Sequence, residues 1–231
     1  GLLAEGLSGR GAARAIPEGP RKSTLSEAWI ERSRAELLKL RERDLSKKHW
    51  VAVFIDGVFL RKDVCAVVAV GLDDDGRKQV LDFELGSSES YQVAVDMLRR
   101  CRARGFEAPA GSRLLGIADG ASALHKALRK HWPDIVLQQC LVHAERHLLE
   151  RLRKGDKPEA QELIKRLRLA HGTEAASEAF DELCKFVQPR HIEAYNGLNE
   201  AKERLIAVHG LELGETLQRS LLSTNAIENT F

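Results

Sequence analysis

Three short runs of apolar and β-branched residues constrain the fold of this chain more than any other feature. They cover residues 50–55, 64–72 and 79–85, and the Asp73–Gly76 segment before the third run has the composition of a tight turn. Apolar runs this short and this continuous are typical of strands that are buried on both faces of a sheet. We therefore predict three consecutive antiparallel strands, a meander.

Beyond residue 85 the spacing of apolar residues alternates between the period of a helix and that of a strand. The elements that this spacing predicts are a helix over 90–104, a strand over 113–118, a helix over 121–131 and a strand over 135–139. His125 and His131 are expected on the solvated side of the second of these helices. With the meander, this order predicts an α/β fold, a mixed five-stranded sheet with helices on both faces.

Residues 142–222 show no strand pattern, and their apolar residues recur at helical spacing. Four helix-breaking residues divide this stretch: Pro158, Gly172, Pro189 and Gly210. We therefore predict an all-helical region that is followed by one last helix from Thr224. Near the other end of the chain, residues 24–45 have the pattern of a separate helix.

The composition excludes two classes of protein. A hydrophobic share of 43% and a charged share of 30% are those of an ordinary globular protein. No apolar run is long enough to span a bilayer and no signal-peptide pattern begins the chain, so we expect a cytoplasmic protein without a membrane partner. The four cysteines are widely scattered, and in that compartment we expect them to be reduced.

The net charge of +2 hides an uneven distribution along the chain. Residues 1–50 hold 11 Lys and Arg against 7 Asp and Glu. Further basic residues gather at Arg99, Arg100, Arg102, Arg104 and Arg113. A locally basic surface suits a polyanionic partner, although a solvated charged face explains the same residues equally well.

Two aspartates stand where predicted strands end. Asp56 follows the first strand in Phe-Ile-Asp-Gly, and Asp119 follows the fourth in Ile-Ala-Asp-Gly. If those strands are neighbours, the two carboxylates converge at one edge of the sheet, where they repel each other and favour a bound divalent cation. Each residue taken alone is also explained as part of a turn, because Asp-Gly is a common turn dipeptide.

Glu228 is a third candidate, on the last predicted helix. Ser223 or Thr224 can cap that helix, which places Glu228 about one turn inside it, where the helix dipole alone would also favour an acid. Asn225 and Asn229 flank the glutamate and could hold its carboxylate or touch a phosphate, with helix capping as the alternative for Asn225. Sequence spacing by itself does not bring Glu228 to the aspartates.

Cys140 and His143 lie one helical turn apart, so their side chains could face the same way. A zinc site would need two more ligands. The histidines that could supply them are His147, His191 and His209. We favour a structural role for the pair, in packing the helical region against the sheet, over zinc binding.

The motifs around these residues occur in a characteristic order. Val-Phe-Ile-Asp56-Gly is followed by Ala-Asp119-Gly, by Cys140-x-x-His143 and by Ser-Thr-Asn-Ala-Ile-Glu228-Asn, with the longest interval before the glutamate. This order resembles the bacterial insertion-sequence transposases of the mutator type, which have an Asp-Asp-Glu triad. The resemblance implies a DNA transposase with a ribonuclease-H-like core, which cleaves and transfers strands at the ends of a mobile element.

The resemblance also implies a domain organisation. Residues 1–45 would be the tail and linker of an N-terminal DNA-binding region, and 46–141 the ribonuclease-H-like core. Residues 142–220 would form a helical insertion, and 221–231 the start of a truncated last catalytic helix. Met97 is the only methionine, so we expect the chain to be part of a longer protein.

The cofactors and partners that the resemblance implies are two Mg²⁺ or Mn²⁺ ions and double-stranded DNA. Asp56, Asp119 and Glu228 would hold the ions, with Asp56 bridging both. The protein would act as a homo-oligomer on transposon ends and target DNA at the bacterial nucleoid. Two alternatives stay open: a ribonuclease-H-like nuclease without joining activity, and a degenerate transposase remnant that only binds DNA or dimerises.

Overall fold

The computed structural model describes residues 22–86, 88, 90–211 and 213–228. The chain divides into two compact units, residues 1–44 and residues 45–231. In the first unit, α2 (Lys22–Glu42) is the helix that the sequence placed at residues 24–45, and residues 1–21 of the expected tail lie outside the described part. Within the described residues, no helix combines the length and apolar character that a membrane crossing requires.

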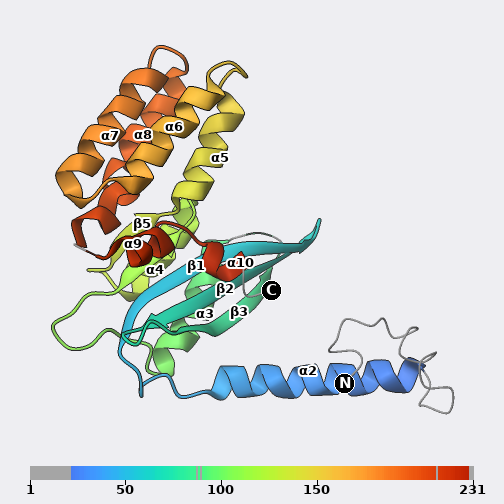
Figure 1. Ribbon diagram of the computed structural model, residues 1–231. Coiled ribbons are helices and arrows are strands. Elements are labelled where there is room, and N and C mark those ends of the chain that lie inside the picture. The colour runs from blue at the N-terminus through green and yellow to red at the C-terminus, as the bar shows by residue number, and fades with distance from the viewer. Residues whose placement is uncertain (1–21, 87, 89, 212, 229–231) are drawn as a thin grey trace. The chain divides into compact units, whose positions relative to one another are not determined.

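The second unit is built on the mixed five-stranded sheet that the sequence predicted (Figure 1). The strands are β1 (Trp50–Arg61), β2 (Val64–Asp73), β3 (Lys78–Gly86), β4 (Leu115–Ala118) and β5 (Val136–Gln139). Their order across the sheet is β3-β2-β1-β4-β5. The first three pair antiparallel, which confirms the meander, whereas β4 and β5 run parallel to β1.

The central position of β1 explains its uninterrupted apolar sequence. Val53 and Ile55 point into one hydrophobic core and Ala52 and Phe54 into another, because successive side chains of a strand leave opposite faces. All four side chains are almost fully buried. A strand that is covered on both faces lacks the alternation of polar and apolar residues that a half-exposed strand shows.

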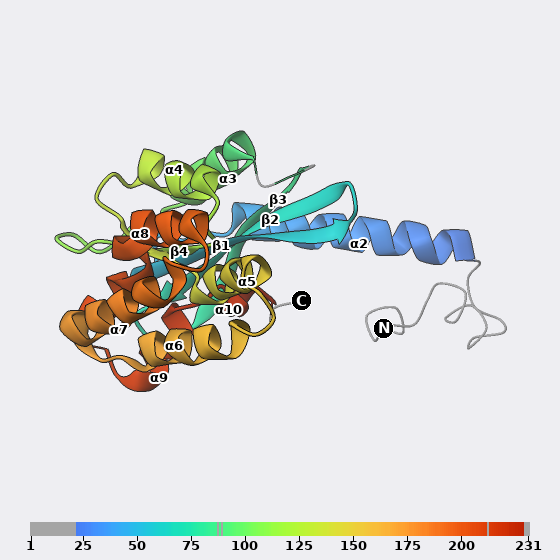
Figure 2. The same ribbon diagram turned by 90° about the horizontal axis from the view of Figure 1, so that it is seen from above.

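One face of the sheet is covered by α3 (Tyr91–Ala103) and α4 (Ser122–His131), and the other by the helices that follow β5 (Figure 2). The Ser90 hydroxyl caps α3 by accepting a hydrogen bond of 3.3 Å from the Val93 N–H. His125 and His131 are buried, so the prediction that they lie on a solvated face was wrong. The reason is packing: His131 Nε2 lies 2.9 Å from the Val95 carbonyl of α3.

The all-helical character of residues 142–222 is confirmed. The helices are α5 (Leu141–Arg151), α6 (Lys157–Leu169), α7 (Gly172–Val187), α8 (Ile192–Ile206), the 3-10 helix η1 (Ala207–Leu211), α9 (Glu215–Leu221) and α10 (Asn225–Glu228). Gln138 on β5 ties this region to the sheet, because its buried amide donates to the Leu205 carbonyl at 3.1 Å and accepts from the Val208 N–H at 2.9 Å.

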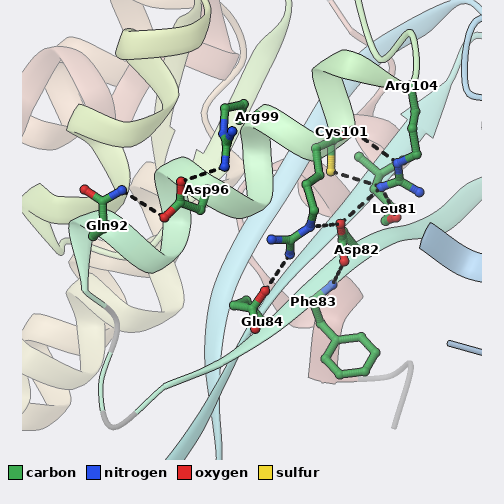
Figure 3. Close-up of polar contacts among 10 residues, drawn as sticks. Leu81, Asp82, Phe83, Glu84, Gln92, Asp96, Arg99, Cys101 and Arg104 are labelled. Atoms are coloured by element: carbon green, nitrogen blue, oxygen red, sulfur yellow. Dashed lines mark hydrogen bonds and ion pairs between the residues drawn. The ribbon is translucent and has the colours of Figure 1, made fainter. Parts of the chain in front are cut away.

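The arginines of α3 are engaged with carboxylates around them (Figure 3). Arg100 Nε donates to the fully buried Asp82 carboxylate at 3.0 Å, and Arg104 Nη2 lies 3.3 Å from the same oxygen. The neighbouring arginines also form ion pairs, Arg99 with Asp96 and Arg102 with Glu107. All four positive charges are therefore locally compensated, and those of Arg100 and Arg104 join α3 to β3.

Candidate active site

Asp56 lies inside β1, and the prediction that the first strand ends just before it was wrong. The strand continues to Arg61 because its antiparallel pairing with β2 extends past Asp56, which pairs with Val68. The parallel pairing with β4 ends earlier, at Ile55 and Ala118. Asp56 is therefore the first residue of β1 beyond the end of β4.

Asp119 directly follows β4, as predicted. Because Ile55 and Ala118 are the last paired residues of the two parallel strands, Asp56 and Asp119 are the next residue of each strand. The alternation of side chains assigns Asp56 to the face of Phe54 and Asp119 to the face of Ile117, both of which belong to the core shared with α5–α10. The two carboxylates thus leave one edge of the sheet on the same side.

Backbone groups orient both carboxylates. The Gly57 N–H donates to Asp56 Oδ1 at 2.9 Å, and the Ala121 N–H donates to Asp119 Oδ1 at 2.8 Å. The second bond also closes the turn that leads into α4, so Asp119 has the turn role that the Asp-Gly dipeptide suggested. One oxygen of each carboxylate is held, which limits the orientations of the other.

The positive charge near the Asp56 carboxylate does not fully compensate its burial. Its side chain is almost fully buried, and this burial raises its pKa above the ordinary value. A hydrogen bond from Thr224 and the charge of His143 act in the opposite direction, while the charge of Asp119 raises the pKa further. The influence of Asp119 on this pKa shows that the two acids are electrostatic neighbours.

Cys140, His143 and Thr224 form a cluster beside the aspartates. Cys140 Sγ accepts hydrogen bonds from the Thr224 N–H at 3.4 Å and from its hydroxyl at 3.5 Å, and Thr224 Oγ1 lies 3.4 Å from His143 Nδ1. The hydrogen bond to Cys140 raises the pKa of His143 to about 9, and the charges of Cys140, Asp56 and Asp119 contribute. Burial raises the pKa of the Cys140 thiol, but hydrogen bonds with His143 and Thr224 outweigh it, so that the pKa is lowered. The cluster joins the end of β5 to the segment before α10.

The histidines considered as further zinc ligands have other surroundings. His191 Nδ1 accepts from the Ala194 N–H at the start of α8, and His209 Nε2 lies 2.9 Å from the Leu167 carbonyl. His147 lines the cleft that Asp119 borders. Among the described side chains, no group of three or more His, Cys, Asp or Glu is arranged to hold a metal ion. The Glu228 side chain is not among them.

The short helix α10 places the backbone of Glu228 against the central strands. Ile227, the preceding residue, is fully buried in the core that includes Phe54 of β1 and Val68 of β2. The Ile227 N–H donates to the Thr224 carbonyl at 2.8 Å and so forms the first turn. Asn225 is exposed, while Asn229 and the side chain of Glu228 lie outside the described residues.

A cleft of about 390 Å³ opens beside Asp119, between the sheet edge and the helices α5 and α8. Ala144, Ala194 and Leu198 contribute to its apolar floor, while Gln139 and Arg151 add polar groups. An acidic group at the rim of an open cleft is accessible both to a cation and to a larger substrate.

Thr224 was missed as a site residue in the sequence, where its only expected role was that of a helix cap. The structure shows that its hydroxyl lies 3.5 Å from Cys140 Sγ and 3.4 Å from His143 Nδ1, and that it lowers the pKa of Asp56. The only signal was its place in the Ser-Thr-Asn-Ala-Ile-Glu-Asn run, and a threonine before a helix is explained equally well by capping.

Comparisons with known proteins confirm the resemblance to transposases of the mutator type. The model of the family described as "Transposase, Mutator family" matches residues 14–230. A transposase for insertion sequence element IS6120 of Mycolicibacterium smegmatis is 29% identical over 212 residues, which are 90% of this chain and 62% of the relative. A transposase for insertion sequence element IST2 of Acidithiobacillus ferrooxidans is 29% identical over 168 residues, 73% of this chain and 55% of the relative.

A more distant relative matches almost the whole chain. It is the transposase for insertion sequence element IS256 in transposon Tn4001 of Staphylococcus aureus, which is 24% identical over 240 residues, 98% of this chain and 60% of the relative. The chain therefore spans somewhat more than half the length of these relatives. Since the family model matches nearly all of the sequence, the chain belongs to the Mutator family of transposases.

Proposed function

We propose that this protein is a DNA transposase that cleaves strands at the ends of a mobile element and joins them to new DNA. Asp56, Asp119 and Glu228 would be its three acids. The observation that supports this most directly is the strand register: Asp56 and Asp119 follow the last parallel pair of β1 and β4, on one face of the sheet. The helix that includes Glu228 packs on that same face.

The order of elements supports a ribonuclease-H-like core. An antiparallel meander is followed by α3, β4, α4 and β5, and the helical region stands before α10. We assign residues 46–141 to the core, 142–220 to a helical insertion and 221–231 to the start of the last catalytic helix. Residues 1–45 would link this part to a DNA-binding region.

The site fits a divalent cation. The positive charge that acts on Asp56 comes from His143, and burial still raises the pKa of the carboxyl, so a cation would relieve a repulsion that the protein leaves unbalanced. Carboxylate oxygens are hard ligands that suit Mg²⁺ or Mn²⁺. Two such ions, held by Asp56, Asp119 and Glu228, would activate the attacking oxygen and stabilise the leaving one.

The protein's own groups would keep this site in shape. The backbone N–H groups of Gly57 and Ala121 hold one oxygen of each aspartate. Thr224 contacts Cys140 and His143, and the Cys140 N–H donates to the Ala118 carbonyl just before Asp119. The segment that leads into α10 is therefore tied to the edge of the sheet that includes the aspartates. We therefore assign Cys140 and His143 a positioning role and propose no zinc at this pair.

Nicking of supercoiled plasmid DNA in Mg²⁺ or Mn²⁺ tests this function. Nicking should occur with the unaltered chain, stop with EDTA and fall on the order of 1,000-fold or more with Asp56→Asn, because the substitution removes a ligand charge. The matched control is Asp134→Asn, which changes an exposed carboxylate and should keep full activity.

Strand joining separates transposase from nuclease. Linear DNA that ends in the sequences flanking the gene should be joined to a target plasmid by the same chain. Nicking without joining would favour the ribonuclease-H-like nuclease. DNA binding without metal-dependent nicking would favour a degenerate remnant. We also expect a homo-oligomer on DNA, since two ends have to be held together, and light scattering of the complex measures its mass.

A further inference from the structure

A groove of about 410 Å³ runs along α9 and the start of α10. Most of its lining can donate or accept hydrogen bonds. The polar residues are Arg168, Thr216, Arg219, Ser220, Ser223 and Asn225. Val142 and Leu222 are its apolar lining residues. Two guanidinium groups, three hydroxyls and an amide thus face one space.

The charges around this groove are mainly positive. Arg219 is exposed in the last turn of α9. Lys78, at the start of β3, donates to the Ser220 hydroxyl at 3.0 Å, which places a third cationic side chain beside the groove. Arg168 is anchored by Glu145 at 2.6 Å, so its charge is partly compensated but its guanidinium is held in place.

This groove differs from the other basic region of the protein. The arginines on the opposite side of the sheet are paired with carboxylates. Figure 3 shows the pairs of Arg99 and Arg104, and Arg100 and Arg102 are paired as well. They are therefore poor candidates for contacts with a polyanion. The groove combines its cationic groups with hydroxyls and an amide, the set of donors that proteins use for phosphate oxygens.

The groove adjoins the candidate active site. Ser223 and Asn225 line it, and the N–H of Thr224 between them donates to Cys140 Sγ. The Cys140 N–H in turn donates to the carbonyl of Ala118, the residue before Asp119. We propose that the groove holds backbone phosphates of the DNA strand next to the bond that is cut, without reading its bases. This inference rests on the proposed function, because it places the substrate of that same site. An arginine on a phosphate adds affinity and strengthens the salt dependence of binding.

DNA binding in EDTA tests the groove without any cleavage. The probe is a fluorescein-labelled 30-base-pair duplex of arbitrary sequence, and its anisotropy is measured between 50 and 200 mM salt. Arg219→Ala should weaken binding roughly 3- to 10-fold and lower the slope of log K against log salt by about 1. Arg219→Lys should keep the slope because it keeps the charge.

The matched control is Arg99→Ala, which removes the same charge from an exposed position on the opposite side of the sheet. Its slope should equal that of the unaltered chain. The proposal would be overturned if Arg219→Ala and Arg99→Ala lost equal affinity for DNA, or if Arg219→Ala left the slope unchanged. It would also be overturned if the unaltered chain did not bind the duplex at 50 mM salt. Displacement of the labelled duplex by an acidic peptide, but not by unlabelled DNA, would also overturn the proposal.

Cross-linking locates the strand independently. All four native cysteines are buried, so an introduced exposed cysteine is the preferred target of a thiol-reactive DNA backbone. Thr216→Cys in the groove should cross-link at least several-fold more than Ser112→Cys, another exposed position on a loop. Equal yields at the two positions would contradict the groove.

The two proposals can fail separately. If Arg219 supports DNA binding and Thr216→Cys cross-links but no metal-dependent nicking is found, the groove stands and the proposed function fails. If nicking requires Asp56 while binding is indifferent to Arg219, the function stands and the groove fails.

Discussion

The sheet and the helical region that follows it place the three acids proposed for this site in different ways. Asp56 and Asp119 stand directly after the last paired residues of the parallel strands β1 and β4, so the hydrogen bonds of the sheet determine their separation. Glu228 belongs to a four-residue helix whose position depends on everything between β5 and Thr224. Strand register thus determines the positions of the two aspartates, whereas tertiary packing determines the position of Glu228.

The two regions nevertheless share one hydrophobic core. Phe54 of β1 and Phe180 of α7 are both fully buried members of the same cluster, which also includes Ile227 of α10. Since neighbouring parts of a continuous core lose their contacts together, we expect the sheet and the insertion to unfold as one cooperative unit. The following predictions test how far the two regions act together, in order of decreasing effect on stability.

Truncation of the shared core should have the largest effect. Phe54→Ala and Phe180→Ala should each lower the free energy of unfolding by about 3–5 kcal/mol, because each leaves a large cavity. Urea unfolding should be followed by far-UV circular dichroism, which reports mainly on helices, and by the fluorescence of buried Trp50 and Trp132. Coincident transitions in both variants are expected, and separate transitions in Phe180→Ala would show that the insertion is an independent unit.

The polar link between the two regions should come next. Gln138→Leu removes the partner of the Val208 N–H and of the Leu205 carbonyl, so we expect a loss of about 2–4 kcal/mol in the free energy of unfolding. The control Gln161→Leu changes an exposed residue of α6 and should stay within about 0.5 kcal/mol. If Gln138→Leu lowered the free energy of unfolding no more than the control does, the hydrogen bonds of Gln138 would contribute nothing to stability.

Acid should destabilise the sheet region through His125. Burial lowers the pKa of His125 from 6.5 to about 4, so between these values the unfolded chain binds the proton that the folded chain does not. Its contribution to stability is therefore present above pH 6.5 and is lost as the pH falls toward 4. His125→Gln should flatten the pH dependence of unfolding by about 1–3 kcal/mol across that window. This assignment would be contradicted if the free energy of unfolding changed with pH equally in His125→Gln and in the unaltered protein.

The connection between the insertion and the acids should affect activity far more than stability. Thr224→Val removes the hydroxyl that contacts Cys140 and His143, at a cost of about 1–2 kcal/mol in stability. Nicking should fall on the order of 10–100-fold, because small misplacements of catalytic groups are costly. Thr224→Ser keeps the hydroxyl and should keep most of the activity. A loss of nicking no greater than the loss of stability explains would remove Thr224 from the positioning residues.

Local patterns predicted most of the secondary structure. The β-branched runs predicted the meander, and the helical spacing of residues 142–222 predicted an all-helical region. The end of β1 was wrong because a strand stops where its pairing stops, and the extra pairing with β2 is not visible around Asp56. His125 and His131 were assigned to solvent because a polar side chain on a short helix does not reveal that a second helix covers it.

The sequence by itself determined the type and order of the elements and the chemistry available to the site: two aspartates after apolar runs, a glutamate on a late helix and a Cys-x-x-His pair. Only the tertiary structure decided that Asp56 and Asp119 share one face and that Thr224 contacts Cys140 and His143. It also decided that Arg100 and Arg104 pair with Asp82 while Arg219 lines a groove. The physical reason is the sequence distance over which each effect acts. Hydrophobic periodicity and turn chemistry act between residues a few positions apart, whereas the electrostatics of a carboxylate depend on neighbours that distant segments bring to it.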